Sequence, residues 1–137
     1  MFNALNNDDQ GQVEHDVELW KQRKLVKLLN EAKGNGTSMI SLALPPGQQI
    51  HVTQKLLVDE LGAASCIKSR VVRQSFKDAL TWVQQRLKLF SKTPANGLVI
   101  FAGLVHTDDG KEKRVCVDIQ PSLAPIARSV YMCDNRF

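Results

Sequence analysis

Apolar residues spaced three or four positions apart predict three helices along the chain. The first is expected to begin at Asp16 and to end before Gly34-Asn35-Gly36, because glycine accepts the left-handed geometry of a helix C-terminus. A short second helix is expected over 52–61. A longer third helix is expected over 69–90, with Ser69 as its N-cap.

Runs of apolar residues with β-strand character predict four strands. One lies over 37–44 (TSMISLAL), and three more lie over 97–105, 114–119 and 129–133. The Asp-Gly pair ending at Gly110 separates two of them and is a strong hairpin signal. The pattern therefore predicts an α+β fold, in which a mainly antiparallel four-stranded sheet is packed with helices.

The length of 137 residues suits one domain, and 43% hydrophobic with 23% charged residues is close to the globular average. No apolar run is long enough to span a bilayer, and the polar N-terminus does not resemble a secretory signal. We expect a disordered lead-in over 1–15, a single domain over 16–137, a cytoplasmic location and no membrane partner.

Charge is distributed unevenly, although the net charge is only +4. Residues 1–20 contain five acidic residues and no Lys or Arg, whereas residues 61–92 contain one acidic residue, Asp78. The basic residues of the second segment are Lys68, Arg70, Arg73, Lys77, Arg86, Lys88 and Lys92. Such a concentration is expected for a nucleic-acid contact, but a solvated helix face is an equally good interpretation of the charge alone.

Motifs of catalysis and metal binding are missing from the sequence. The three histidines, His15, His51 and His106, fall in different elements, and no HExxH, GxSxG or P-loop pattern occurs. The three cysteines form no CxxC pair, which argues against a zinc cage or a disulfide framework. We therefore expect no enzyme activity, no catalytic residue, no cofactor and no metal; the segment 45–49 (PPGQQ) is interpreted as a turn-forming linker.

The loop over 63–68, at the tip of the predicted helical hairpin, is the best candidate contact site. A helix beginning near Ser69 presents backbone N–H groups, and Lys68 and Arg70 add full charges beside them, so a phosphate or a nucleotide edge is favoured there. An ordinary capped turn with exposed basic residues explains the same pattern equally well.

Two other short segments could extend that site. Gly36, Thr37 and Ser38 combine a bendable backbone with two hydroxyls, although a helix stop followed by a strand is the simpler interpretation. Tyr131 and Cys133 alternate on one strand face; such residues usually belong to a core, but an exposed tyrosine could stack on a base.

These segments, taken in order, resemble a known family. The matching motifs are Gly34–Leu42 (GNGTSMISL), Asp59-Glu60, Ser65–Arg70 (SCIKSR) and Tyr131-x-Cys133-x-x-x-Phe137, with Val83–Leu89 and Asn96–Val99 in support. Together they resemble the N-terminal, stop-codon-decoding domain of the eukaryotic class-1 peptide-chain release factor. The resemblance covers roughly residues 16–137.

The resemblance implies decoding without catalysis. In that family the middle domain carries a Gly-Gly-Gln motif that promotes peptidyl-tRNA hydrolysis, and the C-terminal domain binds the class-2 GTPase. No Gly-Gly-Gln occurs here, and the chain stops where the family continues. The expected partners are the mRNA stop codon and the decoding centre of the small ribosomal subunit, with the GTPase bound by other parts of a full-length factor.

The family's recognition residues carry over by position. Ile67, Lys68 and Ser69 resemble the part of the loop that faces the first uridine. The residues that resemble those lining the purine positions are Thr37, Ser38, Glu60, Tyr131 and Cys133. Phe137 is expected to pack beneath them. The complete expected RNA-binding set is Gly36, Thr37, Ser38, Glu60, Ser65, Cys66, Ile67, Lys68, Ser69, Arg70, Arg73, Tyr131, Cys133 and Phe137.

Three departures from the family pattern bear on specificity. The usual loop reads Thr-Ala-Ser-Asn-Ile-Lys-Ser; here Ala63 and Cys66 replace its first and fourth residues, and Val72 replaces a common Asn in the next helix. Such polar losses are typical of protists that have reassigned a stop codon. We expect UAA and UAG to be favoured over UGA, with the opposite preference as the alternative. The competing function is a non-enzymatic protein-interaction adaptor with a basic helix.

Overall fold

The computed structural model describes residues 2–32, 34, 39–106, 109–121, 124–134 and 137, with side chains from residue 13 onward. The chain divides into two units, residues 1–31 and 32–137, and each is described by itself. Gly36, Thr37 and Ser38, three of the expected site residues, lie outside the described residues.

The first unit is the helix α1, Phe2–Glu31. Its C-terminal half follows the predicted helix, but the helix begins at Phe2, where the sequence predicted a disordered lead-in up to residue 15. This stretch contains no proline and a single glycine, Gly11, so it holds few of the residues that most strongly break a helix. Further along α1, the Lys24 ammonium lies 5.1 Å from the centre of the Trp20 ring.

The second unit contains the predicted antiparallel sheet. Its four strands are β1 (Met39–Leu44), β2 (Leu98–His106), β3 (Glu112–Ile119) and β4 (Val130–Asp134), and all neighbours are antiparallel in the order β3-β2-β1-β4. β2 and β3 form the expected hairpin, and Gly110 adopts the positive φ of +80° that its turn requires. This confirms the α+β prediction.

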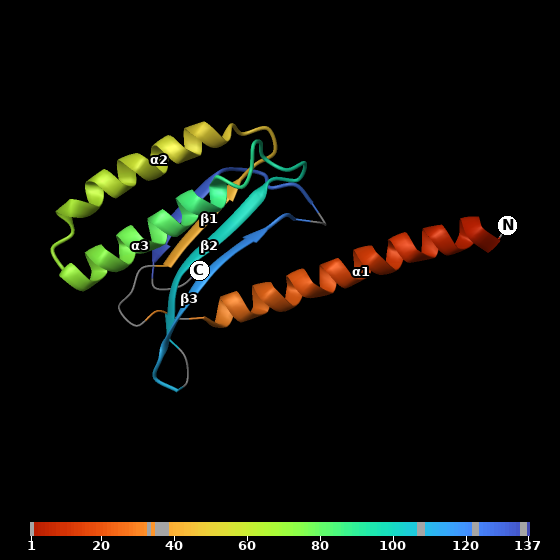
Figure 1. Cartoon of the computed structure of the whole chain (residues 1–137), viewed down its shortest axis with the longest axis horizontal. Helices are drawn as coiled ribbons and strands as arrows, with labels where there is room; N and C mark the ends of the chain where they lie inside the picture. Colours follow the sequence, from red (N-terminus) through yellow and green to blue (C-terminus); the bar gives the residue numbers. More distant parts are fainter. Residues whose placement is uncertain (1, 33, 35–38, 107–108, 122–123, 135–136) are drawn as a thin grey trace. The chain divides into compact units, whose positions relative to one another are not determined.

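One face of this sheet is covered by α3 (Arg70–Leu87), and a second helix, α2 (Ile50–Ala63), lies antiparallel beside α3 (Figure 1). The two helices are joined through the short 3-10 helix η1 (Ala64–Cys66). α3 ends three residues earlier than the predicted Phe90, because Leu89 and Phe90 donate backbone hydrogen bonds to carbonyls three positions back and close a turn. No helix within the described residues has the length and apolarity that crossing a membrane demands.

The core lies between α2, α3 and the sheet. Alternate residues of the two central strands point toward the helices, as the two-residue period of a strand requires. The sheet contributes Ile40, Leu42, Leu44, Leu98, Ile100 and Ala102, and the helices contribute Leu57, Ala79, Leu80, Val83 and Leu87. Each of these side chains is at most 1% exposed, so this layer fixes the hairpin on the sheet.

Arg86 and Trp82 fasten α3 to the edge strand β3. The Arg86 guanidinium lies 3.2 Å from the Asp118 carboxylate and donates a 2.6 Å hydrogen bond to the Cys116 carbonyl. The Arg114 guanidinium stacks over the Trp82 ring at 4.4 Å. Arg86, one of the basic residues that suggested a nucleic-acid contact, therefore has a structural partner within the fold.

Candidate nucleic-acid interface

The expected contact loop lies at the tip of the α2–α3 hairpin. α2 ends at Ala63, η1 follows, and α3 begins directly after Ser69, as predicted. The Ser69 hydroxyl accepts the backbone N–H of Val72 at 3.4 Å, which satisfies one of the open donors of the first helical turn. The sequence-based N-cap is thus confirmed.

Two apolar residues anchor this loop while its polar residues face solvent. Ala64 is 1% exposed and belongs to the core cluster, and Ile67 is half-buried against it. Two short-range hydrogen bonds brace the backbone: Ser65 Oγ donates to the Gly62 carbonyl at 3.0 Å, and Arg73 Nη1 donates to the Ile67 carbonyl at 3.4 Å. The side chains exposed at this tip are Ala63, Ser65, Cys66, Lys68, Ser69 and Arg70.

Lys68 and Arg70 give the loop its positive charge. No ion pair joins either of them to another residue in the part of the chain that the structure describes. Both are exposed at the N-terminal end of α3, whose backbone dipole adds a partial positive charge. The tip can therefore attract an anionic strand without first breaking an internal pair.

Tyr131 and Cys133 lie on β4, on the helix-covered face of the sheet. The register places Tyr131 opposite Leu42 and Cys133 opposite Ile40, both of which belong to the core layer. Tyr131 packs against the core as a partly buried residue, whereas Cys133 is exposed. The prediction that both residues share one strand face is confirmed.

The Tyr131 hydroxyl lies close to Glu60, in the last turn of α2. Burial, then the negative charge of Glu60 and a smaller contribution from Cys133, raise the pKa of Tyr131 well above its usual value. The hydroxyl oxygen is buried and makes no hydrogen bond of full geometry within the described residues, although a weak hydrogen bond with Glu60 adds to the rise in the pKa of Tyr131. Tyr131 therefore keeps its proton, and its hydroxyl faces the Glu60 carboxylate without a well-formed hydrogen bond.

Glu60 connects this group to the basic loop. Its backbone carbonyl accepts the N–H of Ala64, the first residue of η1, while its side chain influences Tyr131 on β4. The structure thus brings Glu60, Tyr131 and the start of the loop together from two elements far apart in the sequence. Among the specificity-altering positions, Ala63 and Cys66 are exposed here, and Val72 is partly exposed in the first turn of α3.

Phe137 is separated from Tyr131 by the sheet. Its ring meets Phe101 edge-on, with centroids 5.3 Å apart and an interplanar angle of 67°. Phe101 alternates with the core residues Ile100 and Ala102, so it points to the other face of the sheet. Phe137 packs beneath the sheet, as expected, and its position favours a structural role.

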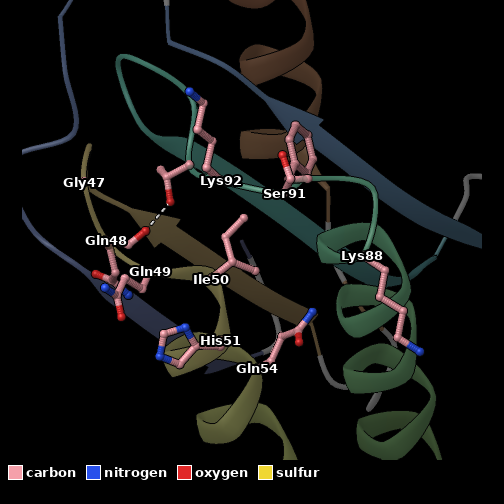
Figure 2. A pocket seen from close by; sticks show the side chains of 11 residues that line it. Gly47, Gln48, Gln49, Ile50, His51, Gln54, Lys88, Ser91 and Lys92 are labelled. Atoms are coloured by element: carbon pink, nitrogen blue, oxygen red, sulfur yellow. Dashed lines mark hydrogen bonds between the residues drawn. The ribbon is translucent and has the colours of Figure 1, made fainter.

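The sequence analysis missed a second group of residues at the opposite end of the hairpin. The turn before α2, the first turns of α2 and the segment after α3 line a pocket there, shown in Figure 2. Gln48, Lys88 and Lys92 are among its residues, and the segment interpreted only as a linker forms one wall. The sequence contains two lysines four positions apart, Lys88 and Lys92, which could have indicated this pocket. The residues that form its other side lie about forty positions earlier in the chain, so no local pattern joins the two sides.

Comparisons with known proteins agree with the resemblance. The chain is 56% identical over 122 residues to eukaryotic peptide chain release factor subunit 1-3 of Arabidopsis thaliana, covering 89% of this chain and 28% of that protein. It is 56% identical over 121 residues to the protein of the same name from Brassica oleracea var. botrytis, covering 88% and 28%. The chain therefore spans a little over a quarter of the length of these curated relatives.

Solved structures share the fold. An archaeal protein superposes with a TM-score of 0.77 at 33% identity, covering 85% of this chain and 32% of that chain. The crystal structure of the archaeal translation termination factor aRF1 gives a TM-score of 0.75 at 32% identity, covering 85% and 31%. The model of the family described as eRF1 domain 1 matches residues 17–137. This chain belongs to the eRF1 domain 1 family.

Proposed function

We propose that this chain recognises mRNA stop codons in the decoding centre of the small ribosomal subunit during translation termination. The observation that carries the proposal is the position of Glu60, which links the exposed basic loop to the buried Tyr131 hydroxyl. Family membership over residues 17–137 supports the same function. The role is recognition; hydrolysis of peptidyl-tRNA and binding of the class-2 GTPase belong to other domains of a full-length factor.

The chemistry of these groups suits a purine at the second and third codon positions. The Glu60 carboxylate accepts from the N6 amino group of adenine, whereas guanine presents its O6 acceptor on that edge and is repelled. A purine acceptor would give the Tyr131 hydroxyl a better-aligned partner than the Glu60 carboxylate. One misplaced hydrogen bond in a dry site costs about 1–3 kcal/mol, or about tenfold to a hundredfold in discrimination per contact.

The basic loop suits the uridine and the phosphates around it. Lys68 and Arg70 are exposed and unpaired within the described residues, and the loop is narrow enough to enter a groove that a flat surface cannot enter. Ile67 packs against the core as a partly buried residue, so it anchors the backbone next to Lys68. An anchored backbone loses less conformational entropy on binding than a mobile one does.

We further propose that the chain favours UAA and UAG over UGA. Ala63 and Cys66 present a methyl group and a thiol to solvent at the tip, where the family's usual loop has a hydroxyl and an amide. A thiol is a weak donor and a weak acceptor, so the hydrogen bonds that would accommodate a guanine there are lost. Glu60 and Tyr131, which suit adenine, are retained.

A chimera tests both proposals. This chain, joined to the catalytic and GTPase-binding domains of a standard release factor, should release peptide from ribosomes at UAA and UAG and release little at UGA. The double variant Ala63→Thr/Cys66→Asn should raise release at UGA, and Ala95→Thr, a similar change at an exposed position outside the site, should not. Equal release at all three codons would reject the preference, and no release from a folded chimera would reject decoding.

A further inference from the structure

The pocket at the base of the α2–α3 hairpin has a volume of about 670 Å³. It lies at the start of α2 and the end of α3, so the 18 residues of α3, about 27 Å of helix, separate it from the basic loop. None of its lining residues belongs to the set described above as the candidate interface. Its volume falls within the range of small-molecule and cofactor sites.

Hydrogen bonds between distant segments hold the pocket open. The Thr93 hydroxyl, after α3, donates to the Gln48 carbonyl, before α2. The Gln48 side-chain amide in turn donates to the hydroxyl of Thr53 at 2.9 Å, and Thr53 is 2% exposed. Gly47, with φ of +82°, and the bond from Gln48 N to the Pro45 carbonyl close the preceding turn. The pocket is therefore preformed.

Its electrostatic character is positive. Lys88 and Lys92 both line the pocket, and in Figure 2 their side chains extend in different directions, with His51 and Gln54 on the α2 side. No carboxylate occurs among the described residues that line the pocket, and neither lysine has an ion-pair partner in the described part of the chain. Two uncompensated ammonium groups around one opening favour a ligand with two separated negative charges.

The other lining groups suit a nucleobase. Gln54 carries an amide that both donates and accepts, as the edge of a base requires, and Phe90 offers a half-buried aromatic ring. Bases in single-stranded RNA stack on aromatic side chains, and two phosphates flank each internal nucleotide. The carboxylates of an acidic peptide would pair with the two lysines, but they would not provide matching contacts for the Gln54 amide and the Phe90 ring.

We propose that this pocket binds one nucleotide of a single-stranded RNA, with Lys88 and Lys92 on the two flanking phosphates and the base inside against Phe90 and Gln54. The chain then contacts RNA at both ends of the hairpin, once at the loop and once at its base. This site goes beyond the proposed function, because binding there needs single-stranded RNA but does not need a stop codon.

Binding of a short oligocytidine and a short oligoadenosine to the 137-residue chain tests the site, since neither RNA contains a stop triplet. In NMR titrations with labelled protein, we expect the amide signals of 48–54 and 88–93 to shift. In fluorescence anisotropy, Lys88→Gln/Lys92→Gln should weaken binding at least about tenfold. The slope of log affinity against log salt should fall by about 1.4, from two single-strand phosphate contacts at about 0.7 each.

The matched control is Lys27→Gln/Lys113→Gln, which removes the same charge from exposed positions outside the pocket. It should weaken binding less than about twofold. Gln54→Ala should weaken binding about threefold and leave the salt slope unchanged, because it removes a base contact and no charge. Thermal unfolding of each variant identifies any loss of affinity that comes from a loss of fold.

Four outcomes would overturn the proposal. Equal losses in the two double-lysine variants would mean general electrostatic attraction, and RNA-induced shifts confined to 65–70 would mean that the loop is the only contact. Displacement of RNA by an equal concentration of inorganic phosphate would mean a simple anion site, and stronger shifts with oligoglutamate than with RNA would mean a protein site. If the chimera does not respond to stop codons while the pocket still binds RNA, the result contradicts the decoding proposal and leaves the pocket proposal intact.

Discussion

The two ends of the α2–α3 hairpin are built differently. At the loop end, the hydrogen bonds that brace the backbone join residues at most six positions apart, such as Ser65 to Gly62 and Arg73 to Ile67. At the base, they join Thr93 to Gln48 across 45 positions and Asn96 to Pro121 across 25. The loop end can therefore change its exposed side chains at little cost in stability, whereas the base helps to hold the second unit together.

The largest effect is expected at the base, at Gly97. Its φ is +94°, and a Cβ there would clash with the Leu44 carbonyl oxygen and lie 2.9 Å from Ile126 Cγ1. Gly97→Ala combines backbone strain with a clash against a core strand, so we expect the free energy of unfolding in urea to fall by about 2–5 kcal/mol. Gly110→Ala is the control: its φ of +80° is equally unfavourable, but nothing lies within 4 Å, so it should cost about 1–2 kcal/mol.

The next effect concerns pH and the loop end. The pKa of Tyr131 is raised in the folded state above about 10, the ordinary pKa of tyrosine in an unfolded chain. The stability that the protonated hydroxyl contributes is therefore fully present below about pH 10. Above that pH the unfolded chain releases the proton first, so the free energy of unfolding should fall by up to about 1.4 kcal/mol per pH unit. Unfolding in urea across this range measures the slope, and Tyr131→Phe should remove this contribution.

Tyr131 is the only tyrosine in the chain, so its ionisation can also be followed directly by ultraviolet absorbance. The folded protein should show tyrosinate absorbance only at pH values well above those of the urea-unfolded chain. Glu60→Gln should lower the folded-state pKa, since it removes a negative charge, but burial should keep it above the ordinary value. Identical titrations of the folded and unfolded chains would contradict the burial of this hydroxyl.

A smaller effect is expected from Thr53, at the base. Its buried hydroxyl accepts the Gln48 amide, so Thr53→Val leaves that amide without its partner and should cost about 1 kcal/mol in the free energy of unfolding. Thr81→Val provides the matched control, since its hydroxyl bonds to the Lys77 carbonyl on the exposed side of the same hairpin. Thr81→Val should change the stability by less than about 0.5 kcal/mol. If the two variants lose the same free energy of unfolding, the hydrogen bond between Gln48 and Thr53 contributes no more to stability than an exposed one.

The features that were predicted correctly from the sequence are those that depend on residues close together in the chain. Periodicity gave the α+β class, the four strands and the two helices of the hairpin, and Ser69 was placed correctly because an N-cap depends on its immediate neighbours. Residues 2–15 belong to α1 in the structure, whereas their polar composition suggested a disordered lead-in.

The rest depends on tertiary contacts that no local pattern contains. Arg86 counted as a basic surface residue until the fold brought Asp118 and the Cys116 carbonyl to it. The base pocket joins 45–49 to 88–93, and neither segment has a recognisable motif by itself. Glu60 and Tyr131 were expected at one site through family resemblance. The structure adds that the Tyr131 hydroxyl is buried and lies close to the Glu60 carboxylate.

The smallest effect on stability is expected at the loop tip, where the effect on function should be the greatest. Lys68 is exposed and has no ion-pair partner within the described residues, so Lys68→Gln should change the free energy of unfolding by less than about 0.5 kcal/mol. The same change in the release-factor chimera should abolish the response to stop codons. Lys113→Gln, on β3, is the control that should alter neither property. If Lys68→Gln instead unfolds the domain, this lysine contributes to the stability of the fold. The contrast between a loop end that tolerates substitution and a base that stabilises the fold would then be wrong.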